Sequence, residues 1–137
     1  MTSKIAVIGF GNIAKAILTP LLEKRLIDPR NVYCLVKSKK SLEDIQENYQ
    51  YKINISQANS DYLNLVWECQ VKLLAVKPQQ LKEIIEKPVN KPGQNLLVSI
   101  LAGVSLEKLK QKFPNHRCAR VVTNIPITVA KGLTGIS

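Results

Sequence analysis

The chain has 137 residues, enough for one domain with its own hydrophobic core. Hydrophobic residues make up 45% of it and charged residues 22%, as in an ordinary globular protein. No apolar run approaches the ~20 residues that a membrane-spanning helix needs. The formal net charge of +10 lies mostly in residues 71–137, which hold eleven basic and three acidic residues, and it favours anionic ligands. Because Phe113 is the only aromatic residue after Trp67, that half lacks a base-stacking surface, and we expect neither nucleic acid nor a membrane as a partner.

The cysteines Cys34, Cys69 and Cys118 are odd in number and show neither metal-ligand nor CxxC spacing. We interpret them as buried or partly buried thiols in a reducing cytosol, and we expect no metal site. The segment Met1–Lys4 leads directly into a strand-like run, unlike a signal peptide. The expected location is therefore cytoplasmic.

Strand-like and helix-like segments alternate along the chain. Short apolar runs predict strands at Lys4–Ile8, Val32–Val36, Ile53–Ile55, Val71–Val76, Asn95–Ile100 and Cys118–Val122. Helical patterns lie between them, near Asn12–Arg25, Lys40–Asn48, Ser60–Cys69, Pro78–Lys87 and Ser105–Phe113. We interpret Lys87–Gln94 as a loop and the segment from Asn124 to Ser137 as irregular chain followed by a short strand. This order predicts an α/β fold, a doubly wound, mostly parallel sheet with helices on both faces.

The segment Gly9-Phe10-Gly11-Asn12-Ile13-Ala14 connects the first predicted strand to the first predicted helix. In this Gly-x-Gly-x-x-Ala pattern, Gly9 permits the tight turn, Gly11 lets the backbone approach a pyrophosphate, and Ala14 lets the helix pack closely on the strand. The N–H groups at the start of the helix then face the anion. The position of the motif favours a dinucleotide site of the Rossmann type over a tight turn that binds nothing.

The end of the second predicted strand indicates which dinucleotide is bound. A site that prefers NAD has an acidic residue there, which holds the ribose 2′-hydroxyl. This chain instead has Lys37-Ser38-Lys39-Lys40, where three lysines and a hydroxyl can pair with a 2′-phosphate. The segment therefore predicts NADPH rather than NADH, the alternative being a basic surface turn.

Ligands of doubly wound sheets bind at the carboxyl ends of the strands, which makes the residues after the later strands candidates. These are Lys77-Pro78, Ala102-Gly103 and Asn124. His116, the only histidine, lies instead in a predicted polar turn at the amino end of the sheet, where we expect a surface role.

Four motifs in order resemble those of the pyrroline-5-carboxylate reductases, which make proline. They are Ile8–Ala14, Leu74–Gln79, Ser99–Ser105 and Arg120–Pro126, and in the last of these Val122, Thr123 and Ile125 depart from the family pattern. The resemblance implies a Rossmann domain that binds NADPH, with hydride transfer to 1-pyrroline-5-carboxylate to give L-proline.

The resemblance also implies a set of cofactor-binding residues. Asn59 would lie near the adenosine, Asn124 near the nicotinamide, and Ser38 with Lys39 or Lys40 would hold the 2′-phosphate. The remaining candidates are Gly9, Phe10, Gly11, Asn12, Ile13, Ala14, Ala75, Val76, Lys77, Pro78, Ala102 and Gly103.

The family has a C-terminal helical domain that builds a homo-oligomer and supplies substrate-binding and acid-catalytic groups. We expect residues 1–137 to be the dinucleotide-binding domain alone, so that the catalytic residues lie outside this sequence and the chain binds cofactor without turnover. Three alternatives remain open. They are a related imine or deazaflavin-linked reductase, a stand-alone nucleotide-sensing module that binds a partner protein, and an electrostatic nucleic-acid binder.

Overall fold

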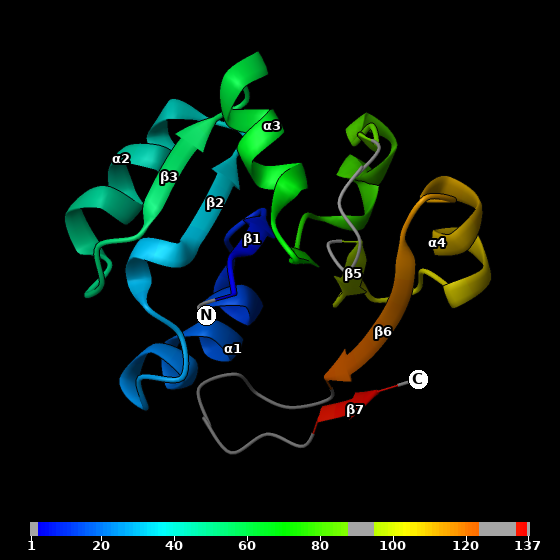
Figure 1. The fold of residues 1–137 in the computed structure, drawn as a ribbon, viewed down its shortest axis with the longest axis horizontal. Helices are drawn as coiled ribbons and strands as arrows, with labels where there is room; N and C mark the ends of the chain where they lie inside the picture. Colours follow the sequence, from blue (N-terminus) through cyan, green and yellow to red (C-terminus); the bar gives the residue numbers. More distant parts are fainter. Residues whose placement is uncertain (1–2, 88–94, 124–133, 137) are drawn as a thin grey trace.

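The fold is a twisted sheet covered by helices on both faces (Figure 1). A computed structural model describes residues 3–87, 95–123 and 134–136. Within these ranges the sheet has seven strands in the order β3-β2-β1-β4-β5-β6-β7. Strands β1 to β6 pair in parallel, and β7 pairs antiparallel to β6. The strands are β1 Ile5–Ile8, β2 Val32–Val36, β3 Asn54–Gln57, β4 Val71–Leu74, β5 Leu96–Ser99, β6 Arg117–Thr123 and β7 Thr134–Ile136.

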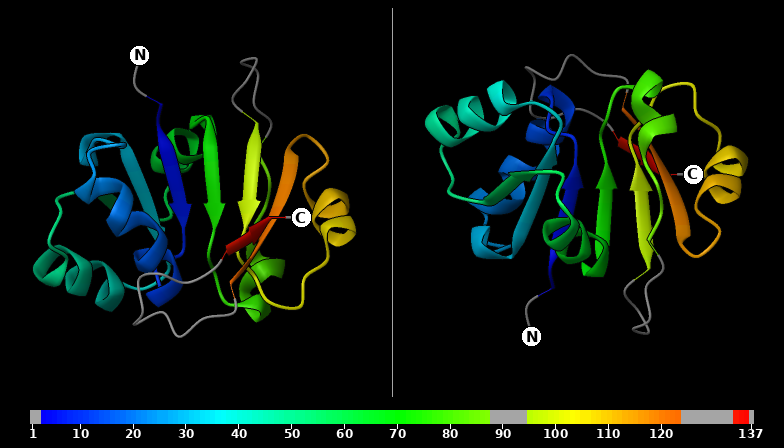
Figure 2. Two further views of the ribbon diagram at one scale, coloured as in Figure 1. Left: turned by 90° about the horizontal axis from the view of Figure 1, so that it is seen from below. Right: turned by 90° about the horizontal axis from the view of Figure 1, so that it is seen from above.

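The helices divide between the two faces of the sheet, as Figure 2 shows. They are α1 Asn12–Glu23, α2 Lys39–Asn48, α3 Ser60–Glu68, α4 Leu106–Lys112 and the 3₁₀ helices η1 Pro29–Asn31 and η2 Pro78–Glu83. Successive residues of β1 point to opposite faces. Val7 packs with Leu18 of α1 on one face, whereas Ala6 and Ile8 belong to the core that contains Trp67 of α3 on the other. The doubly wound α/β fold predicted from the sequence is confirmed.

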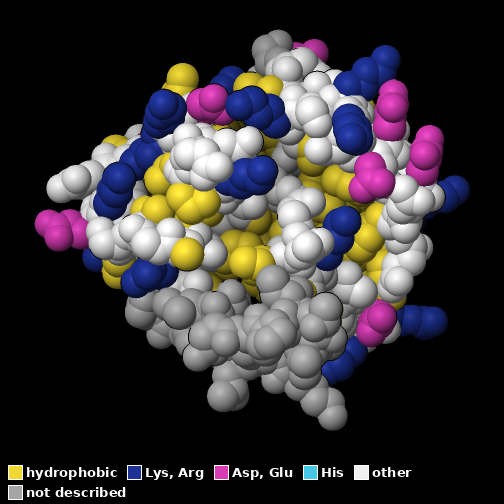
Figure 3. Space-filling view, turned by 180° about the vertical axis from the view of Figure 1, so that it is seen from behind, with side chains coloured by type: hydrophobic (Ala, Val, Ile, Leu, Met, Phe, Trp, Pro, Cys, Tyr) yellow, Lys and Arg dark blue, Asp and Glu magenta, His cyan; other side chains and the backbone are white. Residues whose placement is uncertain are grey.

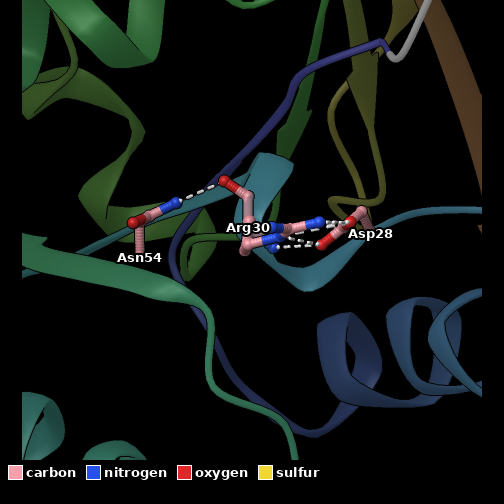
Figure 4. A network of polar contacts seen from close by, with 3 residues as sticks. All are labelled: Asp28, Arg30 and Asn54. Carbon is pink, nitrogen blue, oxygen red and sulfur yellow. Dashed lines mark hydrogen bonds and ion pairs between the residues drawn. The ribbon is translucent and has the colours of Figure 1, made fainter.

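A polar network joins the starts of β2 and β3 (Figure 4). The carboxylate of Asp28 accepts hydrogen bonds from the backbone and side chain of Arg30, at 2.8–3.3 Å, and thereby closes the turn of η1. The Asn54 amide donates to the carbonyl oxygens of Arg30 at 2.8 Å and Val32 at 3.0 Å. These bonds align the short strand β3 beside β2.

The predicted helix over residues 78–87 is wrong in type and length, because only the 3₁₀ helix η2 forms there. Ile84 at its end is already extended, with ψ at 125°. Pro88 disfavours helical geometry at Lys87. Glu86 also contacts the turn before β6. Its carboxylate accepts hydrogen bonds from the backbone N–H of Asn115 at 3.0 Å and from the side-chain amide of Asn115 at 2.9 Å.

The expected surface role of His116 is also wrong, because its side chain is fully buried at the amino end of the sheet. Its Nδ1 pairs with Glu86, and its ring lies edge-on to Trp67 with the ring centres 5.3 Å apart. Burial lowers the pKa of His116, and the hydrogen bond to Glu86 partly opposes that effect. Lys72 of β4 is also fully buried, and burial lowers its pKa to about 8.

The cysteines are buried or partly buried thiols, as expected. Cys34 and Cys69 are buried, Cys118 is half-buried, and all three are free thiols. Burial raises the pKa of Cys69 to about 11, so this thiol is protonated and unreactive near neutral pH.

Candidate functional site

The glycine turn between β1 and α1 has the geometry that its sequence predicts. Gly9 has φ at +87°, and a Cβ atom there would lie 2.8 Å from the carbonyl oxygen of Ala75, so only glycine fits. Gly11 precedes the first residue of α1 and has an ordinary extended backbone, with φ at −93°. A Cβ atom at Gly11 would meet nothing within 4 Å. Space is therefore open for a ligand to approach this backbone.

A cavity of about 460 Å³ begins at this turn. It lies along the carboxyl ends of β1, β4, β5 and β6, where ligands of doubly wound sheets bind. Its lining comprises Gly11, Asn12, Ile13, Ala14, Ala75, Val76, Lys77, Pro78, Ile100, Leu101, Ala102, Arg120 and Val121. All four motifs that carry the family resemblance thus contribute to one cavity.

The lining has a charge pattern suited to an anionic ligand. Its ionisable side chains are Lys77 and Arg120, and no described Asp or Glu belongs to it. The Nε atom of Arg120 is buried and has no hydrogen-bond partner in the described part of the chain. A buried donor without a partner costs about 1–3 kcal/mol, which a polar ligand can recover. The residues present therefore fit a phosphate-bearing cofactor.

Local hydrogen bonds hold the two loops that wall the cavity beyond the glycine turn. Gln80 accepts a bond from the backbone N–H of Lys77 at 3.1 Å, and Pro78 occupies the first position of η2. In the other loop, the buried Ser99 hydroxyl accepts from the backbone N–H of Leu101 at 3.2 Å. Gly103 has φ at +74°, which allows the chain to turn into α4.

The basic turn after β2 lies outside the cavity lining. Ser38 caps α2 by accepting a hydrogen bond from the backbone N–H of Ser41 at 3.1 Å. Lys39 lies 4.0 Å from the carboxylate of Glu43, and Lys40 is exposed. The first turn of α2 therefore presents its cap and two exposed lysines at the carboxyl edge of the sheet.

Five other predicted site residues also lie apart from the cavity lining or outside the described ranges. Gly9 lies in the turn against the backbone of Ala75. The ring of Phe10 packs edge-on against Tyr49, with the ring centres 5.1 Å apart. Asn59 caps α3 through a 2.9 Å bond from the backbone N–H of Tyr62. Gly103 shapes its turn, and Asn124 lies outside the described residues.

Sequence reasoning missed four cavity-lining residues, Ile100, Leu101, Arg120 and Val121. The rule that ligands bind at carboxyl strand ends could have found the first two, because they directly follow β5. Arg120 and Val121 lie within β6, where that rule does not apply, but both belong to the fourth motif of the family resemblance, Arg120–Pro126, which could have indicated them.

Basic side chains do not form a single stripe on the face shown in Figure 3. Lys and Arg side chains are spread around a region of apolar side chains, with Asp and Glu among them. This distribution resembles a solvated surface more than a nucleic-acid track. No helix among the described residues is long and apolar enough to cross a membrane, and no group of three or more described His, Cys, Asp or Glu residues could hold a metal ion.

Comparison with known proteins agrees with this geometry. The chain is 33% identical over 137 residues to pyrroline-5-carboxylate reductase of Synechocystis sp. and covers 49% of that protein. It is 33% identical over 135 residues to the enzyme of the same name from Pasteurella multocida and covers 48% of it. The solved pyrroline-5-carboxylate reductase from Coxiella burnetii superposes with a TM-score of 0.76 at 27% identity, over 99% of this chain and 49% of that one. The chain thus spans about half the length of the curated relatives it matches.

A family model described as NADP oxidoreductase, coenzyme F420-dependent, matches residues 4–103, which are most of the chain. The resemblance to pyrroline-5-carboxylate reductases is also confirmed by the relatives of that name. The chain therefore belongs to the family of coenzyme F420-dependent NADP oxidoreductases, and it is similar to about half of a pyrroline-5-carboxylate reductase.

Proposed function

We propose that this chain is the NADPH-binding part of a pyrroline-5-carboxylate reductase. The observation that carries the proposal is the cavity that runs from the glycine turn to Arg120 along the carboxyl edge of the sheet. The relatives named as pyrroline-5-carboxylate reductases support the reaction. When bound, NADPH supplies a hydride to the imine carbon of 1-pyrroline-5-carboxylate, which gives L-proline.

The chain's own groups would bind and orient the cofactor. The first turn of α1 has backbone N–H groups without helical partners, and they would hold the pyrophosphate where it passes Gly11. The loops at Lys77-Pro78 and Ala102-Gly103 would enclose the half of the cofactor that carries the nicotinamide, together with Asn124. The unpartnered Nε of Arg120 would donate a hydrogen bond at that end of the cavity.

The preference for NADPH over NADH is assigned to the start of α2. Ser38, Lys39 and Lys40 would hold the 2′-phosphate, because a helix N-terminus and two ammonium groups all favour an anion there. Asn59 would lie near the adenosine. NADH lacks the phosphate and would gain nothing from these groups.

The remaining proposals concern the whole protein. We propose that residues 1–137 form the dinucleotide-binding domain of a cytoplasmic homo-oligomer. Groups that bind the substrate carboxylate and donate the proton would come from a further domain. Turnover of 1-pyrroline-5-carboxylate by the isolated chain would contradict this division.

Calorimetric titration of the chain with NADPH and with NADH tests the cofactor assignment. We expect tighter binding of NADPH, and we expect Lys39→Gln/Lys40→Gln to reduce NADPH affinity to that of NADH. The matched control is Lys108→Gln/Lys110→Gln, which removes two exposed charges from α4 on another part of the sheet. Equal binding of both cofactors by the unmodified chain would contradict the phosphate assignment, and no binding of either would contradict the proposed function.

A further inference from the structure

The structure places an acidic side chain beside the basic turn Lys37–Lys40, which itself contains no acidic residue. The carboxylate of Glu83 accepts hydrogen bonds from the Nζ atom of Lys37 at 2.9 and 3.1 Å. Lys37 directly follows β2, whereas Glu83 is the last residue of η2, 46 positions later in the chain. The sequence of the β2–α2 segment therefore gives no indication that Glu83 lies beside it.

This ion pair lies between two parts of the proposed cofactor site. On one side is Ser38, the residue after Lys37, which caps α2. On the other is η2, whose first residue, Pro78, lines the cavity. Gln57 at the end of β3 donates to the carbonyl oxygen of Lys37 at 3.1 Å and holds its backbone. The carboxylate is thus brought to the end of β2, where dinucleotide-binding folds hold the ribose 2′ group.

The charge of Glu83 has opposite consequences for the two cofactors. A 2′-phosphate carries close to two negative charges, so it would compete with Glu83 for Lys37 and be repelled by the carboxylate. A 2′-hydroxyl can instead donate a hydrogen bond to a carboxylate at this place. The side chains of Lys37 and Glu83 are 66% and 49% exposed, so the pair itself is weak and can exchange partners.

We propose that Glu83 is a specificity-determining residue that reduces the preference of this site for NADPH over NADH. The inference rests on the proposed function, because it assumes that a dinucleotide lies along this edge of the sheet. Lys37 changes partner from Glu83 to the phosphate when NADPH binds, whereas its pair with Glu83 persists when NADH binds.

The test is calorimetric titration of Glu83→Gln with NADPH and NADH, compared with the unmodified chain. We expect NADPH affinity to rise by about fivefold at low salt, a factor typical of removing one nearby exposed charge, while NADH affinity stays the same or falls. The gain should shrink in ~0.3 M salt because screening weakens exposed charges. The control Glu107→Gln removes the same charge from an exposed position on α4 and should change neither affinity by as much as twofold.

The outcomes separate this inference from the proposed function. If the unmodified chain prefers NADPH and Glu83→Gln leaves the ratio of the two affinities unchanged, the role of Glu83 is refuted and the proposed function stands. An equal gain in Glu107→Gln would also refute it, since the effect would then be one of net charge alone. If the unmodified chain binds neither cofactor, both proposals fail.

Discussion

Two glycines of one motif should fail in different ways when each is replaced by alanine. At position 9, the new Cβ atom would lie 2.8 Å from the carbonyl oxygen of Ala75 and 2.9 Å from the backbone nitrogen of Val76. The backbone there also has φ at +87°, which disfavours any side chain. At position 11 the backbone is ordinary and the space is open. Gly9→Ala therefore perturbs the fold, and Gly11→Ala perturbs only what approaches the turn.

The size of each effect follows from this geometry. In Gly9→Ala, the left-handed backbone costs roughly 1–2 kcal/mol, and displacement of the Ala75 backbone costs roughly 1–3 kcal/mol more. The free energy of unfolding should fall by roughly 2–5 kcal/mol, which lowers the melting temperature by roughly 7–17 °C. In Gly11→Ala, the free energy of unfolding should change by less than about 1 kcal/mol. Loss of even one amide–phosphate hydrogen bond, worth about 1.5 kcal/mol, weakens NADPH binding about tenfold.

Thermal unfolding by circular dichroism and calorimetric titration with NADPH measure the two quantities on the same samples. The reasoning is refuted if Gly11→Ala binds NADPH as tightly as the unmodified chain, because the open space would then not be where the pyrophosphate passes. The reasoning is also refuted if Gly9→Ala melts within 2–3 °C of the unmodified chain, because the close contact with Ala75 would then lower the free energy of unfolding by much less than expected.

Three further predictions concern buried charges. Glu86→Ala should lower the free energy of unfolding by about 3 kcal/mol in urea titrations, because it leaves the buried ring of His116 without its partner and removes the acceptor of two hydrogen bonds from Asn115. Because Glu83 is exposed, Glu83→Ala should lower the free energy of unfolding by less than about 1 kcal/mol. Equal losses of stability in Glu86→Ala and Glu83→Ala would contradict the structural role of Glu86. Lys72→Met should stabilise the protein by up to about 3 kcal/mol at pH 7, the equivalent of a pKa lowered from 10.5 to about 8. Because the pKa of Lys72 is lower in the folded state than in the unfolded state, its charge destabilises the fold below pH 8, and this cost disappears as the pH rises toward 10.5. A stability gain in Lys72→Met that is as large at pH 10 as at pH 7 would contradict the lowered pKa of Lys72. Arg120→Met should weaken NADPH binding severalfold with little loss of stability, because the buried Nε atom of Arg120 has no partner among the described residues. Unchanged NADPH affinity in this variant would show that the Nε atom faces no ligand.

Features that depend on neighbouring residues were predicted correctly from the sequence. The glycine turn and the strand–helix order both involve residues within a few positions of one another. Hydrophobic periodicity and capping chemistry determine such features locally, and strict strand–helix alternation then restricts the topology to a few choices. The alternating order was therefore enough to predict a doubly wound sheet.

The sequence by itself thus determined the fold class and the position of the glycine turn between β1 and α1. Only the tertiary structure decided that Glu83 pairs with Lys37, that Glu86 pairs with the buried His116, and that Arg120 lines the cavity. The two acidic contacts join residues 46 and 30 positions apart, across segments whose path is not set by any local preference. The partner of such a side chain is whichever group the folded chain brings within reach, and the packing of the sheet and helices determines it rather than spacing along the sequence.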